Sequence, residues 1–192
     1  MEAPSLPTET SLPDPQGTVL LWLARASIEE ELGGPHVVPP REPWLAPTTA
    51  TFVTLTRNDE LRGCVGSIEP RRPLGQDVIH SARAAAFRDL RFEPVTEQEL
   101  PEIRIEVAAL SPLVPLPVED ETEARSALVP GRDGVALSFG RVSSVFIPKV
   151  WEHLRDAGDL LEKLKQKAGL PAGFWSPEIR LHTFTARSYR EP

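Results

Sequence analysis

The residues best suited to chemistry lie in one ten-residue stretch, 61–70. It holds the only cysteine of the 192-residue chain and two of its twelve glycines, in the order Leu-Arg-Gly-Cys-Val-Gly-Ser. A thiolate is a nucleophile and a metal ligand, and a nearby guanidinium favours that charged form. Cys64 and Arg62 are therefore candidate catalytic residues. The alternative is that Cys64 is a small buried hydrophobic residue with a packing role.

The elements that must position this stretch read as a β-hairpin. Residues 51–56 are rich in β-branched and aromatic side chains, and 57–60 form a polar turn before the motif. With a period of two, Arg62, Cys64 and Gly66 would share one face of the second strand.

Two glycines inside a strand need a reason, because glycine weakens a strand through entropy and lost packing. The reason is a β-bulge, a close backbone approach, or bare amides offered to a ligand. The last possibility makes four residues of the motif candidates for ligand binding: Gly63, Gly66, Ser67 and Glu69.

Few other residues combine into a recognisable site. His80 is the histidine nearest to Cys64 in sequence and the first candidate general base, although a lone helical histidine is more often a surface or core residue. The histidines lack the spacing of metal ligands, so the sequence predicts no metal site. No phosphate-binding glycine loop, GxSxG or HExxH pattern occurs, and the cofactor stays unknown.

The charge balance, the cysteine count and the apolar runs of the sequence limit the classes of protein that it can belong to. Lysine and arginine number 21 against 28 acidic residues, and the net charge of −7 argues against a nucleic-acid binder, although Arg62, Arg71 and Arg72 are candidates for a local anion site. A single cysteine excludes an internal disulfide and suits a reducing compartment. No signal-peptide pattern and no apolar run of membrane-spanning length occurs, so we predict a cytoplasmic protein without a membrane partner.

Around the motif, alternating strand and helix signals predict one domain. Residues 1–13 read as a disordered arm, and Trp44 in the proline-rich 35–47 segment either staples that segment to the core or lines a cleft. The first half of the chain also predicts a helix from the Asp14 cap to Gly33, a helix over 74–86, a capping box at 96–99 and a strand over 103–110 beside the hairpin. The second half predicts a solvated helix start at 119–123, a second hairpin over 135–147 and a strand over 179–185. Between the last two, a helix is predicted to start at Pro148, to be interrupted, to start again at a cap formed by Asp159 and to end at Gly169.

Leu61 to Ser67 resembles the signature LRGCIGS of the AMMECR-one domain family, with valine for isoleucine. The likeness runs from about residue 19 to 191. Leu90 departs from the family's usual proline in DPRF and Lys149 from its usual glutamine in LPQV. The other blocks that carry the likeness are Phe52 to Leu55, Ala85 to Phe92, Ile105 to Val107, Gly131 to Val135, Phe146 to Trp151 and Lys167 to Leu170.

The resemblance implies two unequal subdomains with the motif in the groove between them. It implies no particular reaction. In its bacterial form the family is called protein A of the AmmeMemoRadiSam system, which implies Memo-like and radical SAM proteins as partners.

Together these observations predict an α+β fold: an antiparallel sheet flanked by helices, with residues 14–192 forming a larger lobe into which a smaller lobe is inserted. The expected function is a ligand-binding or catalytic cleft around the LRGCVGS motif. The alternative is a non-catalytic adaptor that docks onto a Memo-like or radical SAM protein.

Overall fold

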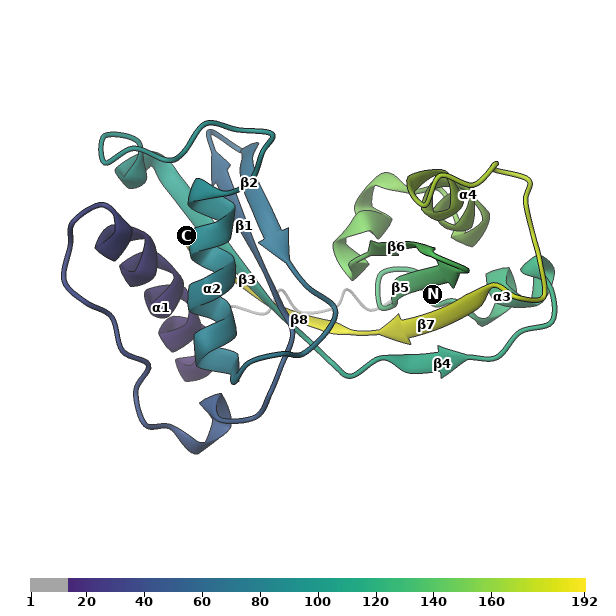
Figure 1. Ribbon diagram of the computed structural model, residues 1–192, viewed down its shortest axis with the longest axis horizontal. Coiled ribbons are helices and arrows are strands. Elements are labelled where there is room, and N and C mark those ends of the chain that lie inside the picture. Colours follow the sequence, from purple (N-terminus) through teal and green to yellow (C-terminus); the bar gives the residue numbers. More distant parts are fainter. Residues whose placement is uncertain (1–13) are drawn as a thin grey trace, which may run out of the picture.

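The computed structural model describes residues 14–192, so the predicted arm over 1–13 lies outside the described residues. The chain forms two lobes, each built on a four-stranded antiparallel sheet (Figure 1). The large lobe comprises 14–110 and 186–192, and the small lobe comprises 113–184. The α+β prediction is confirmed, and the second hairpin belongs to a sheet of its own.

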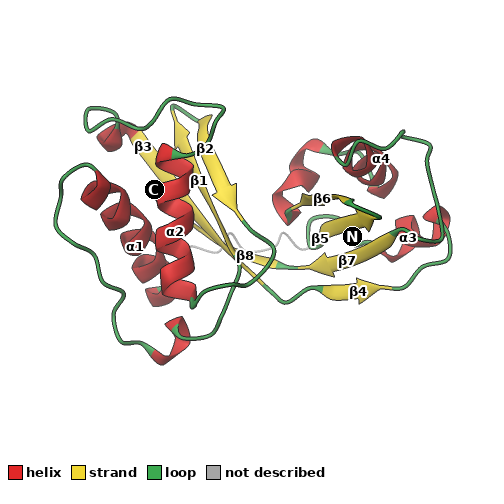
Figure 2. Cartoon of the chain, viewed as in Figure 1, coloured by secondary structure: helices red, strands yellow, loops and turns green. Residues whose placement is uncertain are grey.

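The large lobe packs two helices on one face of its sheet, whose strand order is β2-β1-β3-β8 (Figure 2). Its elements are α1 (Pro15–Glu31), η1 (Pro43–Leu45), β1 (Thr51–Arg57), β2 (Glu60–Gly66), α2 (Leu74–Phe87), η2 (Leu100–Glu102), β3 (Ile103–Leu110) and β8 (Ala186–Arg190).

The small lobe is formed by the chain between β3 and β8, and the strand order of its sheet is β4-β7-β5-β6. Its elements are β4 (Val114–Leu116), α3 (Glu121–Ala127), β5 (Gly134–Phe139), β6 (Val142–Phe146), η3 (Pro148–His153), α4 (Ala157–Lys167) and β7 (Arg180–Phe184).

Helix starts follow local chemistry. The side chain of Asp14 accepts a hydrogen bond from the backbone N–H of Gln16 at 2.9 Å, as its predicted N-cap role requires. The predicted cap at Asp159 is wrong, because Asp156 caps α4 and accepts from the N–H of Asp159 at 2.9 Å. The segment that opens at Pro148 is a separate 3-10 helix.

The two faces of the large sheet differ. Val53 and Leu55 point from β1 to α2 and are fully buried, and they form one core with α1, α2 and the buried side of β3. Phe52, Thr54 and Thr56 point the other way, toward the small lobe. Trp44 packs against the large-lobe core, which favours the staple over the cleft lining.

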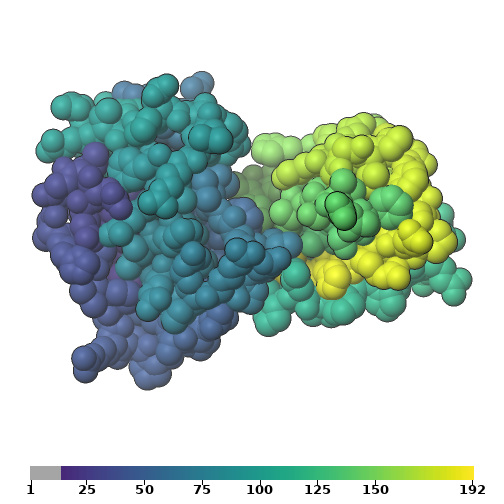
Figure 3. All heavy atoms as spheres, viewed as in Figure 1, coloured from purple at the N-terminus to yellow at the C-terminus, as the bar shows by residue number. Residues whose placement is uncertain are grey.

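The lobes are joined by two crossing segments, one between β3 and β4 and one between β7 and β8, and they meet across a narrow waist (Figure 3). An apolar cluster that includes Leu110, Phe184 and Ile147 fills the joint. Among the described residues, Lys149 and Glu106 form the one ion pair that links the lobes, at 2.5 Å. No helix within 14–192 is long and apolar enough to span a bilayer.

Candidate functional site

Cys64 lies on the edge strand β2 and faces away from the helices. It stands opposite Thr54 on β1, whose hydroxyl Oγ1 lies 3.3 Å from the sulfur. The register continues this row across the sheet, because Thr54 is opposite Glu106 on β3 and Glu106 is opposite Arg190 on β8. One row therefore carries a thiol, a hydroxyl, a carboxylate and a guanidinium across all four strands on the face that looks toward the small lobe.

The partly buried thiol lines a cavity of about 580 Å³ between the lobes, which we call the Cys64 cavity. The large-lobe wall is formed by β1, β2, the turn between them, Arg91 and Arg190. The small-lobe wall runs from Val145 to His153 and includes Lys167. Its charged residues are Asp59, Arg91, Lys149, Lys167 and Arg190. Asp89 pairs with Arg91 and Glu106 pairs with Lys149 behind this wall, so four cations against three carboxylates leave the cavity weakly positive in a chain whose net charge is −7.

Arg62 does not share the face of Cys64, so that prediction is wrong. The register between β1 and β2 shifts, with Thr56 opposite Leu61 and Leu55 opposite Gly63, which leaves Arg62 in a bulge. Its guanidinium binds Glu99 through Nε at 3.0 Å and Nη2 at 3.2 Å. This bond lowers the pKa of Glu99 to about 2.

Arg91 supplies the guanidinium that the prediction assigned to Arg62. Its Nη2 donates to the carbonyl of Cys64 at 3.2 Å and to the buried carboxylate of Asp89 at 2.6 Å. Asp89 in turn accepts from the backbone N–H of Cys64 at 2.9 Å, and the Arg91 bond holds the pKa of Asp89 far below its usual range. The backbone of Cys64 is thus fixed on both sides by the loop after α2.

Lys167, at the end of α4, brings a second cation from the small lobe. Its ammonium donates to the carbonyl of Val145 at 2.9 Å and lies 4.8 Å from the ring centroid of Phe146. Loss of hydration lowers the pKa of Lys167, and the positive charge of Arg91 acts in the same direction. Sequence reasoning missed Arg91 and Lys167. Both belong to blocks of the family resemblance, which was the available signal.

The motif glycines have a packing reason. A Cβ at Gly63 would lie 2.2 Å from the carbonyl oxygen of Ala85 in α2, and one at Gly66 would lie 2.2 Å from the carbonyl oxygen of Thr51. Close backbone approach therefore explains both positions, and a bulge lies beside the first. The amide of Cys64 is not bare, since Asp89 accepts from it.

Three of the candidate ligand-binding residues, Gly66, Ser67 and Glu69, line a neighbouring cavity of about 560 Å³ instead of the Cys64 cavity. The two cavities share Lys167 in their walls. Gly63 faces α2 and lines neither cavity.

The structure does not bring His80 to Cys64. His80 is exposed on α2, which covers the opposite face of the sheet, so it is not positioned to take a proton from the thiol. Desolvation lowers its pKa, and Arg72 lowers it further. Among residues 14–192 no group of three histidine, cysteine, aspartate or glutamate side chains is placed to hold a metal ion.

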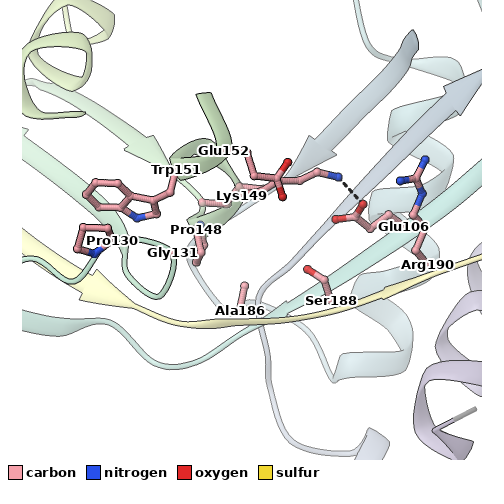
Figure 4. Close-up of a pocket in the computed structure, with 11 residues that line it drawn as sticks. Glu106, Pro130, Gly131, Pro148, Lys149, Trp151, Glu152, Ala186, Ser188 and Arg190 are labelled. Atoms are coloured by element: carbon pink, nitrogen blue, oxygen red, sulfur yellow. Dashed lines mark hydrogen bonds and ion pairs between the residues drawn. The ribbon is translucent and has the colours of Figure 1, made fainter. Parts of the chain in front are cut away.

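A third cavity, of about 790 Å³, adjoins the Cys64 cavity on the side of β8, and we call it the Ser188 cavity. Figure 4 shows Lys149 reaching from the small lobe to Glu106, with Ser188 and Arg190 beside them on β8. Ile147, Lys149 and Arg190 line both cavities. The Lys149–Glu106 ion pair therefore stands at the boundary between two parts of one interlobe cleft.

Comparison with known proteins gives a consistent result. Residues 21–189 match the AMMECR1 family. The chain is 37% identical over 183 residues to a protein of Methanothermobacter thermautotrophicus, covering 92% of this chain and 94% of the relative. Protein MK0488 of Methanopyrus kandleri is 35% identical, with 92% and 88% covered. The crystal structure of the uncharacterized protein PH0010 from Pyrococcus horikoshii aligns with a TM-score of 0.85 at 33% identity, covering 94% of this chain and 93% of that one.

Proposed function

The chain belongs to the AMMECR1 family, and we propose that its Cys64 cavity binds a small anionic organic molecule, with the Cys64 thiol in contact with the ligand. The observation that carries the proposal is the convergence of Cys64, Arg91 and Lys167 on one cavity from two lobes. A site between lobes with apolar walls and a few converging polar groups is the usual form of a small-molecule site.

Charge selects the ligand class. Cations that line a low-dielectric cleft raise the local concentration of anions, even in a protein of negative net charge. Three carboxylates oppose this. Asp89 and Glu106 pair with Arg91 and Lys149, whereas the side chain of Asp59 is 96% exposed and is well screened by water and salt. Lys167 is a strong candidate for contact with the ligand, because its one hydrogen bond to residues 14–192 is to a carbonyl and leaves two of its three donors for a ligand.

The apolar part of the cavity wall indicates that the ligand also has an apolar part. Phe52, Leu61, Phe146, Ile147 and Val150 line the same cavity as the cations. A ligand that buries apolar surface against these side chains gains about 25 cal/mol for each Å² removed from water. An inorganic anion would leave this surface unused, so the ligand we propose is organic.

Alkylation of the single cysteine tests the proposal. We expect the rate ratio of anionic iodoacetate to neutral iodoacetamide at Cys64 to exceed the same ratio for glutathione about tenfold, because the cavity attracts the anion. Intact-mass spectrometry follows the reaction, and one cysteine makes the product unambiguous.

Two lysines of α4 provide a matched pair of variants. Lys167→Gln should lower the ratio about threefold, since it removes one cation from the wall. Lys163→Gln should leave it unchanged, because Lys163 pairs with Asp159 and lies outside the cavity. A folded protein whose thiol reacts with neither reagent, or with the ratio of glutathione, would contradict the proposal.

Docking onto a Memo-like or radical SAM protein is the second candidate. The observation that favours it is the fully exposed side chain of Leu90 beside Arg91, with Leu61 also 44% exposed at the cavity. A leucine side chain this exposed beside a cavity is available for contact with a partner protein.

Sedimentation velocity with the purified partner proteins at micromolar concentration tests docking. Leu90→Ser should weaken the complex. Val38→Ser, an exposed valine on the 35–47 segment, should not. Absence of any complex at that concentration would exclude this candidate.

A further inference from the structure

The four cations of the Cys64 cavity fall into two groups. Arg91 bonds the Cys64 carbonyl, and Lys167 lines the same cavity from the small lobe, with its ammonium on the carbonyl of Val145. Lys149 and Arg190 stand at the boundary with the Ser188 cavity. Asp89 pairs with Arg91 at one end and Glu106 pairs with Lys149 at the other, so Lys167 and Arg190 leave an excess of positive charge at each end of the cavity.

Strand spacing gives the separation of the two groups. Cys64, Thr54, Glu106 and Arg190 form one row across β2, β1, β3 and β8. Neighbouring strands lie about 4.8 Å apart, so the backbone of Glu106, whose carboxylate binds Lys149, is about 10 Å from the backbone of Cys64, and the backbone of Arg190 is about 14 Å away.

The wall between the two ends is mostly apolar. Phe52 lies on the sheet side, and Phe146 and Val150 lie on the small-lobe side. Thr54 and Thr56 are the uncharged polar residues of the sheet wall in this region. A ligand that spans the cavity would thus meet charge at each end and carbon in the middle.

Both cations at the far end are able to accept an anion. Lys149 bonds Glu106 at 2.5 Å, but an ammonium carries three donors, so a second oxygen can be bound without breaking that pair. Glu106 stands opposite Arg190 on β3, but the one carboxylate within 4 Å of the Arg190 guanidinium in the described chain is that of Asp59, at 3.5 Å and almost fully exposed. Such a contact contributes little, and an anion in the cavity would readily replace it.

We propose that the ligand of the Cys64 cavity is an elongated dianion with an apolar middle, one anionic group lying between Arg91 and Lys167 and the other between Lys149 and Arg190. This rests on the proposed function and names the ligand class more narrowly. The anionic groups would lie about 10 Å apart, which corresponds to a straight chain of roughly eight to ten carbons.

Two probe series test the separation and the charge together. Unbranched α,ω-dicarboxylates and α,ω-bisphosphonates of increasing length are compared with the mono-acids of equal length. Binding is measured by isothermal titration calorimetry and by protection of Cys64 from neutral iodoacetamide. We expect one length, near eight to ten carbons, at which the diacid binds at least tenfold more tightly than its mono-acid.

Variants test whether the tighter binding of the diacid depends on Lys149 and Arg190. Lys149→Gln should abolish the advantage of the diacid and leave the affinity of the mono-acid unchanged. Arg190→Gln should reduce the same advantage while keeping the Lys149–Glu106 pair, so its result stands even if the loss of that pair disturbs the lobes. Lys163→Gln on α4 should change neither affinity.

The outcomes separate this inference from the proposed function. Mono-acids and diacids that bind and protect equally at all lengths would overturn the dianion and leave an anion-binding cavity. An equal loss of affinity for mono-acids and diacids in Lys149→Gln would also overturn the dianion and leave an anion-binding cavity. Failure of every probe to bind or to protect, at millimolar concentration, would overturn the inference and the proposed function together.

Discussion

Substitution of Gly63 by alanine tests the packing that sets the motif in place. The added Cβ would lie 2.2 Å from the carbonyl oxygen of Ala85 and 3.1 Å from its carbonyl carbon. Normal carbon–oxygen contacts are about 3.4 Å, so the last turn of α2 must move by about 1 Å. That movement would also displace Asp89, which follows α2 and accepts from the amide of Cys64.

The size of the effect follows from two opposing contributions. Overpacking of this kind costs about 1–3 kcal/mol. Loss of glycine's freedom in the unfolded chain returns about 0.4–1 kcal/mol. The net expectation is a destabilisation of about 1.3 kcal/mol, which lowers the melting temperature of a chain of this size by about 3–5 °C.

Urea unfolding and thermal melts, followed by circular dichroism, measure the effect of Gly63→Ala. Gly173→Ala is the matched control, because no atom lies within 4 Å of the Cβ it would add. We expect that control to be as stable as the wild type or more stable by up to about 1 kcal/mol. A Gly63→Ala protein within about 0.5 kcal/mol of wild type would refute the argument that the glycine is present for the approach of α2.

Three further predictions concern ionised groups. The folded-state pKa of Glu99, about 2, is below its unfolded value. The Arg62 bond should therefore stabilise the fold fully above about pH 4.5 and lose this effect as the pH falls toward 2. Arg62→Ala should make the free energy of unfolding in urea depend less on pH in this range. The side chain of Lys165 is 1% exposed and bonds Glu121 at 2.7 Å, and Glu121 also pairs with Arg125, so Lys165→Ala should destabilise by about 1–3 kcal/mol, whereas retained wild-type stability would contradict the role of this pair. Asp77→Ala should cost about 2–4 kcal/mol in urea unfolding, because it removes the acceptor of two buried donors, and an effect below about 1 kcal/mol would be inconsistent with that account.

Sequence reasoning succeeded where neighbouring residues decide the structure. The Asp14 cap, the hairpin that ends in the motif and the strand over 103–110 depend on local propensity and on alternation, and all three are present. The place of Arg62 could not be found this way. A one-residue bulge is set by strand pairing, and a shift of one residue moves a side chain to the other face.

In the candidate site, too, local residues could be predicted and distant partners could not. Cys64 stood out in the sequence because it is unique, but the cations around it come from distant segments that only the tertiary structure brings together. Lys167 had a sufficient local explanation as a positive charge at a helix end. Residues 186–190 gave no strong strand signal, yet they form β8, because the open edge of β3 supplies their partner.

The position of β8 has a consequence for how the protein is made. The sheet of the large lobe is finished by a strand that follows the whole small lobe, and Glu191 beyond it bonds the amide of Ile105, 86 residues earlier. As the chain leaves the ribosome, one edge of β3 stays unpaired while the small lobe is synthesised and folds. Such distant pairing slows folding, so the sheet of the large lobe should be completed by β8 only after the small lobe has been synthesised.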